Sequence, residues 1–266
     1  MTDLFDDTAN YVLDLASPQR LQIIFKLLEK STTPTKLAKD IGATKQEVHR
    51  NFTRLEDSGL IEKKVDGNYT LTTFGRTICT QVPSVVFISQ NRKYFEKHHF
   101  GEVPHKFQMR CGQLANSTYV KGVSKVLEQW KNIYKNSDEY IYEILSEVPL
   151  DLIEPVVKRI KKGVKFNYIF SESAVVPKGR KALLKKLGFD KLMEKGLIER
   201  KMEKNVQTVI VLNEKEACVM FPTLDGESDI SAMFYSDDAM FHEWCLDYFR
   251  YCWYGSDVFK ESKLKE

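Results

Sequence analysis

The sequence has little of what marks several classes of protein. Its five cysteines are scattered and odd in number, which favours reduced thiols in a cytoplasm over a disulfide framework. The longest apolar run, residues 82–88, contains a proline and is far too short to cross a bilayer. The N-terminus is acidic and lacks the basic and then apolar leader of a signal peptide. We therefore expect a cytoplasmic protein that has no membrane partner.

Catalytic motifs are missing too. The sequence contains no Gly-x-x-x-x-Gly-Lys-Ser/Thr, no Gly-x-Gly-x-x-Gly and no Gly-x-Ser-x-Gly. The adjacent carboxylates Asp237 and Asp238 are better explained as the start of a helix, because negative charge favours helix N-termini. We expect neither enzymatic activity nor a cofactor.

What the sequence does have, over residues 17–71, is the element order of a winged helix-turn-helix. Ser17-Pro18 is an N-cap followed by proline at the first helical position, and a short second helix over 34–40 comes next. After a glycine turn, Thr44 caps a third helix. Asp66-Gly67 then makes a tight turn between two strands. Such a module places one helix in the major groove of DNA.

The third helix has an apolar face and a polar face. Val48, Phe52 and Leu55 recur at helical spacing and should pack on the first two helices. The opposite side carries Lys45, Gln46, His49, Arg50, Thr53 and Arg54. A polar outer face is also what any surface helix has. Its place in a complete module favours DNA contact, since glutamine can pair with adenine and arginine with guanine.

We assign roles to these residues as follows. The base edges are read by Gln46, His49 and Arg50, helped by Thr53. Phosphates are held by Lys45 and Arg54 and, in the hairpin, by Lys63 and Lys64. Residues 1–80 carry no net charge. Without the acidic first sixteen residues, residues 17–80 carry a net charge of only +4. So small a surplus implies few phosphate contacts per subunit, and hence a homodimer.

The rest of the chain predicts a two-domain α/β protein. We expect a winged helix domain over 1–80 and a helical connector over 81–136, with helices at 106–114 and 119–134. The connector carries dimer contacts or packs within the chain. Residues 137–266 alternate strand and helix patterns, which predicts a mixed sheet with helices on both faces.

Charge is uneven in this second half. Residues 155–205 carry a net charge of +10, and residues 206–266 carry −7. The basic residues in question are Lys158, Arg159, Lys161, Lys162, Lys165, Lys178, Arg180 and Lys181. They could line a site for an anionic effector or make a second DNA contact. Alternatively, they fill the solvent faces of two helices and the acidic tail complements them.

Two further groups are weaker candidates. A zinc or copper site could use His98, His99, His105 and Cys111, although their spacing matches no zinc module. Cys245 and Cys252 are two helical turns apart, about 10 Å, which is too far for a disulfide within one helix. We expect these two thiols, and the aromatic residues around them, to be core, with a small-molecule pocket near this helix as the alternative.

Several segments resemble a known family. The winged module with Leu71–Gly75, then Phe87–Phe95, Arg110–Leu114, Met233–Asp238 and Tyr251–Trp253, resembles archaeal winged-helix regulators of the methanogenesis-regulatory-protein type, which are TrmB- and ArsR-like. The resemblance spans nearly the whole chain. It implies a dimeric DNA-binding regulator whose C-terminal domain has a phospholipase-D-like fold. The His-x-Lys signature of phospholipase-D-like enzymes is absent from this sequence, so the resemblance implies a non-catalytic domain.

The sequence thus predicts a regulator that binds specific double-stranded DNA as a homodimer and senses a small-molecule effector with its C-terminal domain. The alternative is a general nucleic-acid-binding or protein-interaction factor that uses the winged helix as a scaffold.

Overall fold

The computed structural model describes residues 2–174 and 176–264. The chain divides into two compact units, Met1–Pro83 and Ser84–Glu266, referred to below as unit 1 and unit 2. The predicted α/β class, with a winged helix followed by a mixed sheet, is confirmed. None of the helices among the described residues combines the length and the apolar character that spanning a bilayer requires.

Unit 1 is the winged helix. Its elements are α1 (Thr2–Leu15), α2 (Pro18–Glu29), α3 (Pro34–Asp40), α4 (Lys45–Asp57), β1 (Ile61–Lys63), β2 (Tyr69–Leu71) and α5 (Thr73–Cys79). The chain then passes into unit 2 through α6 (Val82–Gln90). The expected caps form: Ser17 accepts from the Arg20 N–H, and Thr44 accepts from the Glu47 N–H. The hairpin is antiparallel, with Ile61 opposite Leu71.

The start of α5 lies against the end of α4 at Gly75. The Gly75 N–H donates to the Thr72 hydroxyl at 2.9 Å, which caps α5. A β-carbon added at Gly75 would lie 2.0 Å from the Leu60 carbonyl oxygen. That oxygen belongs to the backbone just before β1 and cannot rotate away, so only glycine fits at this contact.

Unit 2 is built on an eight-stranded sheet of order β10-β6-β5-β4-β7-β8-β9-β3. The strands are β3 (Thr118–Lys121), β4 (Tyr140–Leu145), β5 (Lys165–Ser171), β6 (Ile198–Glu203), β7 (Val209–Asn213), β8 (Ala217–Met220), β9 (Ala232–Ser236) and β10 (Asp257–Val258). Among the named strand pairs, β4–β5 and β5–β6 are parallel. The other pairings are antiparallel.

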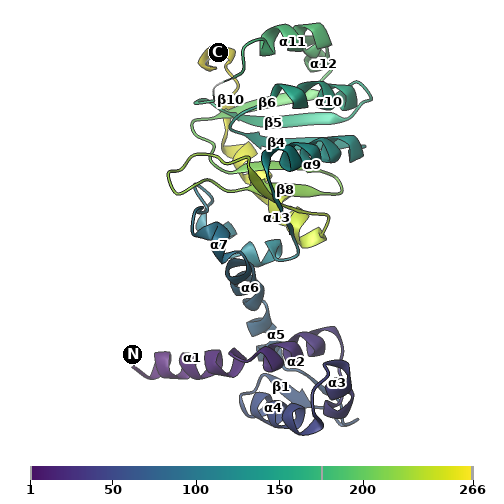
Figure 1. Cartoon of the computed structure of the whole chain (residues 1–266), viewed down its shortest axis with the longest axis vertical. Coiled ribbons are helices and arrows are strands. Elements are labelled where there is room, and N and C mark those ends of the chain that lie inside the picture. Colours follow the sequence, from purple (N-terminus) through teal and green to yellow (C-terminus); the bar gives the residue numbers. More distant parts are fainter. Residues whose placement is uncertain (1, 175, 265–266) are drawn as a thin grey trace. The chain divides into compact units, whose positions relative to one another are not determined.

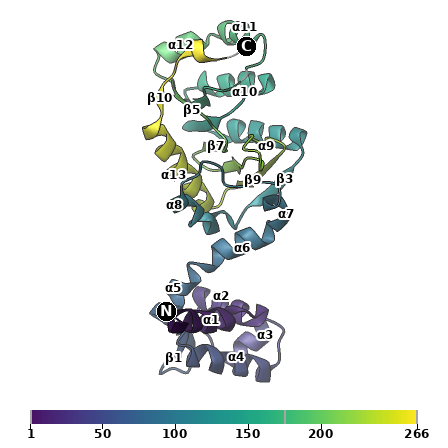
Figure 2. The same cartoon turned by 90° about the vertical axis from the view of Figure 1, so that its left-hand side faces the viewer.

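Helices cover both faces of this sheet (Figures 1 and 2). One face packs on α9 (Val123–Asn136), α10 (Leu150–Ile160), α11 (Arg180–Leu187) and α12 (Phe189–Glu194). The other packs on α13 (Ala239–Gly255) and on the shorter α7 (Arg92–Phe95), α8 (His105–Gln108) and 3₁₀ helix η1 (Cys111–Leu114). A last 3₁₀ turn, η2 (Glu261–Lys263), follows β10.

The segment predicted as a helical connector differs from the expectation. The helix expected at 119–134 begins at Val123, because Thr118–Lys121 is the edge strand β3, with Tyr119 opposite Phe234. β-branched and aromatic side chains favour a strand there, and Gly122 at φ +106° separates it from α9. The helix expected at 106–114 is α8 followed by η1. Dimer contacts through this segment stay a prediction.

One carboxyl lies inside the core of unit 2. Glu143, on β4, is 1% exposed and accepts a hydrogen bond from Trp130 Nε1 at 2.9 Å. The Tyr134 hydroxyl donates to the same oxygen. Burial raises the pKa of Glu143 to about 7, although both donors oppose the shift. α9 is therefore tied to the sheet through a carboxyl that is protonated at mildly acidic pH.

We expect Gly75→Ala to destabilise unit 1 by about 2 kcal/mol or more, because the added methyl overlaps the Leu60 carbonyl. All three tryptophans lie in unit 2, so their fluorescence follows that unit alone. In the variant, circular dichroism should therefore show part of the helix signal lost earlier in unfolding than in the wild type. The unfolding transition followed by tryptophan fluorescence should be unchanged. Gly255→Ala is the matched control, because a β-carbon there meets nothing within 4 Å. An unchanged Gly75→Ala protein would contradict the close approach.

We expect the stability of unit 2 to fall as pH rises, relative to a Glu143→Gln variant. The carboxyl ionises near pH 4.3 in the unfolded chain but only near pH 7 in the fold. Its contribution is therefore complete below about pH 4 and is lost by pH 8, a change of about 3 kcal/mol. Denaturant unfolding followed by tryptophan fluorescence measures it. Glu128→Gln, an exposed change on α9, should keep the wild-type pH dependence. If the free energy of unfolding changed with pH in the same way in the wild type and in Glu143→Gln, the raised pKa assigned to Glu143 would be wrong.

Candidate nucleic-acid interface

The N-terminus of α4 is fixed by reciprocal hydrogen bonds. The Thr44 hydroxyl accepts from the Glu47 N–H at 3.2 Å, and the Glu47 carboxylate accepts from the Thr44 N–H at 3.1 Å. Hydrogen bonds from the Thr44 side chain and backbone lower the pKa of Glu47. The helix therefore starts at a defined residue, which sets the rotation of every side chain that follows it.

The inner face of α4 is buried as predicted. Val48, Phe52 and Leu55 are at most 1% exposed. Buried Asn51 donates to the Gln19 side chain on α2, a contact that the apolar pattern does not reveal. The Phe52 ring meets the edge of Tyr69 on β2, with 4.9 Å between centroids. Helix and hairpin are thus held together through one set of side chains.

The outer face of α4 is exposed and almost unpartnered. All six predicted residues of this face are exposed: Lys45, Gln46, His49, Arg50, Thr53 and Arg54. Within the described part of the chain, no hydrogen bond reaches the side chains of Lys45, Gln46, His49 or Arg50. The Thr53 hydroxyl donates to the His49 carbonyl at 3.2 Å, as a threonine within a helix often does. The first two turns of α4 therefore present free donors and acceptors.

Arg54 differs from its neighbours because it is already paired. Its Nε lies 2.6 Å from Oδ1 of Asp14, on α1. The Asp14 carbonyl also accepts from Arg20. A phosphate would have to compete with Asp14 for this guanidinium.

The hairpin strand β1 lies beside α4 (Figure 1), and two more cations are in this hairpin. Lys63 and Lys64 are exposed, and Lys63 Nζ lies 6.0 Å from the Tyr69 ring centre. Asp66 accepts from the Asn68 N–H at 3.0 Å and shapes the turn. The next residue after Lys64, Val65, is fully exposed at the tip. One valine in a hairpin carries no periodic signal, so this exposed side chain is not predictable from the sequence pattern.

The candidate metal ligands do not come together. The His98 ring stacks on Tyr94, and its Nε2 lies 2.9 Å from Asp229. His99 Nδ1 accepts from the Gly101 N–H. Cys111 is buried, and His105 is exposed at the start of α8. Nowhere among the described residues do three His, Cys, Asp or Glu side chains group closely enough to hold a metal ion.

The cysteines are all free thiols. Burial raises the pKa of Cys252 to about 12 and holds that of Cys245 well above its usual range. Because the thiolate is the reactive form, both environments disfavour redox chemistry. Cys245, on α13, lies in the core as expected, whereas Cys252 is only partly buried and packs against that core.

The basic residues of 155–205 do not form one site. Lys158, Arg159 and Lys162 line a cleft beside α9. Arg180 is 4% exposed, lies over the Phe170 ring and pairs with Glu261 at 3.3 Å. The other basic residues named from the sequence are exposed and lie outside the cleft lining: Lys161, Lys165, Lys178 and Lys181.

Comparison with known proteins bears on the fold. Residues 9–89 match the family described as the HVO_A0261 N-terminal domain, which covers most of unit 1 and less than half of the chain. No match was found among curated protein sequences. One similar structure is that of TrmBL2, described as an archaeal chromatin protein with a novel mode of DNA binding. It is 12% identical over 90% of this chain and 93% of its own, with a TM-score of 0.43.

Two other similar structures align with about half of this chain. NucT from Helicobacter pylori is 12% identical over 54% of this chain and 99% of its own, with a TM-score of 0.42. Nuc from Salmonella typhimurium, a phospholipase D family member, is 13% identical over 55% of this chain and 100% of its own, with a TM-score of 0.40. At such identities no activity is transferred to this chain. The finer resemblance, to the methanogenesis-regulatory-protein type, stays a prediction.

The Asp14–Arg54 pair predicts a gain of function. Asp14→Asn should strengthen duplex binding by about two- to fivefold, because an exposed pair of this kind holds Arg54 by no more than ~1 kcal/mol. Fluorescence anisotropy with a labelled duplex measures it. Asp6→Asn, which removes the same charge elsewhere on α1, is the control. An equal gain in both variants would show that Arg54 does not hold phosphate.

Proposed function

We propose that this chain is a transcriptional regulator that binds specific double-stranded DNA through α4 and the hairpin, with unit 2 as its effector-sensing domain. One observation carries the proposal: at the recognition position of a complete winged helix, the first two turns of the outer face of α4 are exposed, and the side chains of Lys45, Gln46, His49 and Arg50 make no hydrogen bond within the described residues. Its donors and acceptors suit base edges and phosphates.

The spacing along α4 fits base reading. Gln46 and Thr53 are seven residues apart, which is about 10 Å along a helix, or three base steps. His49 and Arg50 lie between them on the same face. With α4 in the major groove, these side chains contact base edges while Lys45 holds a phosphate at the helix start. Lys63 and Lys64 then reach the backbone beside the groove.

We further propose that the protein acts as a homodimer. The modest charge surplus of unit 1 provides few phosphate contacts, and a second copy doubles them. Two recognition helices read half-sites about 34 Å apart, one turn of the duplex. An effector that alters this spacing changes DNA affinity, because both helices must fit at once.

Unit 2 is proposed to be non-catalytic, since the sequence lacks the His-x-Lys signature of phospholipase-D-like enzymes. We expect supercoiled plasmid to survive prolonged incubation with the protein, with and without divalent cations. Accumulation of nicked or linear plasmid, caused by an activity that copurifies with the intact chain, would overturn this part of the proposal.

Arg50 and Lys64 should separate base reading from phosphate binding. On a duplex enriched by selection, Arg50→Ala should weaken binding by about 10- to 100-fold, the value of a good bidentate base contact, with little change on random duplex. Lys64→Ala should weaken both duplexes alike and reduce the salt slope by about one. Lys30→Ala, an exposed change outside α4 and the hairpin, is the control for net charge.

Equal losses on selected and random duplex for both variants would contradict the assigned roles. That result, together with a steep salt slope, would instead identify a general nucleic-acid-binding factor. No duplex binding at any salt concentration would favour a protein-interaction scaffold.

A further inference from the structure

A large cleft lies between α9 and α10 on one face of the sheet of unit 2. Its volume is about 960 Å³, which is in the range of small-molecule sites. Tyr134 and Pro155 are among its lining residues. Pro155 lies inside α10 and has no N–H, so the Asp151 carbonyl lacks its usual helical donor.

Four lysines line this cleft. Lys131 and Lys135 are four residues apart on α9, whereas Lys158 is on α10 and Lys162 lies in the turn just after α10 ends at Ile160. Like charges at the spacing of Lys131 and Lys135 destabilise a helix. Throughout the described residues, no ion pair or hydrogen bond involves the ammonium group of any of the four. The cleft thus collects positive charge that the protein itself does not neutralise.

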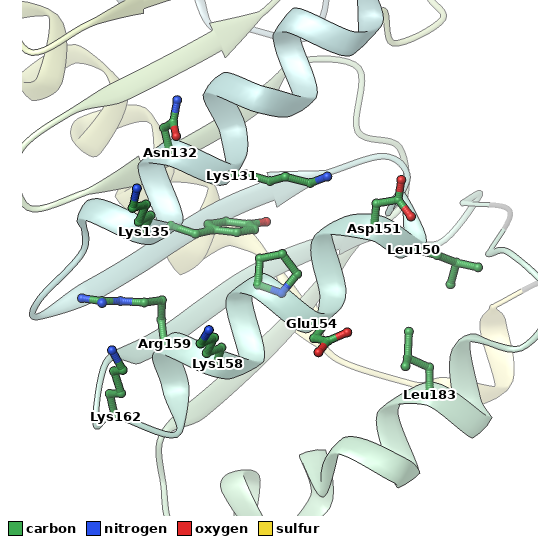
Figure 3. Close-up of a pocket in the computed structure, with 12 residues that line it drawn as sticks. Lys131, Asn132, Lys135, Leu150, Asp151, Glu154, Lys158, Arg159, Lys162 and Leu183 are labelled. Atoms are coloured by element: carbon green, nitrogen blue, oxygen red, sulfur yellow. The ribbon is translucent and has the colours of Figure 1, made fainter.

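The charges in the cleft are sorted by sign (Figure 3). Lys135, Lys158, Arg159 and Lys162 gather at one end, and Asp151 and Glu154 lie at the other. Glu154 and Lys158 have the spacing of a favourable helical ion pair, yet they do not form one. Lys131 extends between the two ends.

Arg159 shapes the basic end without neutralising it. Its Nη2 lies 3.1 Å from Asp138 Oδ1 and also donates to the Ser137 carbonyl, which holds α10 to the chain that follows α9. Its Nε is buried and has no partner among the described residues. The guanidinium is thus fixed in place through Nη2.

We propose that this cleft binds a small polyanion, a molecule with phosphate or carboxylate groups at the lysine end and hydroxyl or amino groups at the Asp151 and Glu154 end. Ammonium groups donate charge-assisted hydrogen bonds to such anions. A nucleic-acid strand along the cleft would place phosphates against Asp151 and Glu154, so a compact ligand fits better. The ligand's role as a regulatory input rests on the proposed function, whereas its binding does not.

Titration calorimetry with sodium tripolyphosphate at constant ionic strength tests the site. The full chain should bind one equivalent, and Lys158→Gln/Lys162→Gln should weaken binding by about tenfold or more. Lys191→Gln/Lys195→Gln is the matched control, with the same spacing and the same charge change on exposed residues outside the cleft. It should bind as the wild type does.

Duplex binding by the same proteins completes the test. Lys158→Gln/Lys162→Gln should keep wild-type duplex affinity in the absence of tripolyphosphate, and Arg50→Ala should keep wild-type tripolyphosphate affinity. Failure of the DNA proposal would therefore leave the calorimetry unchanged. Equal weakening of tripolyphosphate binding in both lysine double variants would overturn the site. Loss of duplex affinity in Lys158→Gln/Lys162→Gln would overturn it too, by identifying a nucleic-acid surface.

Discussion

The burial of one face of α4 determines how the opposite face of this helix is presented to a partner. Val48, Phe52 and Leu55 are removed from water, and Asn51 is hydrogen-bonded to α2. These contacts leave the helix no freedom to rotate about its axis. The outer face therefore has a fixed orientation, and the Cα–Cβ bonds of its polar side chains point in set directions.

This arrangement explains how the outer face can have a fixed orientation although most of its side chains make no contacts within the described residues. A structural surface helix commonly pairs its charges along or between helices, as Arg54 does with Asp14. In the part of the chain that the structure describes, Lys45, Gln46 and His49 make no such contacts, and Arg50 interacts only electrostatically, with Glu47. Their positions instead follow from the cap at Thr44 and the packing beneath them. Pre-organisation of this kind reduces the conformational entropy lost when a partner binds.

The structural features that were predicted well from the sequence are those that depend on residues close together in the chain. Ser17 and Thr44 act within three residues of themselves, so the sequence alone locates the helices that they cap. β3 was missed because its pairing with β9 joins segments more than a hundred residues apart. The metal candidates failed for the same reason, since the partner of His98 is the distant Asp229.

Counting charged residues along the sequence located a basic segment, but it did not show where the fold places those residues. The basic stretch of 155–205 separates into the buried Arg180, which pairs with the partly exposed Glu261, exposed lysines and the cleft between α9 and α10. Two of the lysines that complete the cleft, Lys131 and Lys135, lie outside that stretch and come from α9. The packing of α9 against α10 brings the lysines of α9 together with the basic residues of the 155–205 stretch. That packing is a tertiary contact, which the charge pattern of the sequence does not reveal.

The most direct test of the central claim is selection of bound fragments from randomised duplex DNA by the purified full chain near physiological salt. If α4 reads base edges in a dimer, an inverted repeat with half-sites about one helical turn apart should be enriched. Measurable binding without any enriched sequence would contradict the claim, because an ordered outer face on α4 would then not be reading DNA.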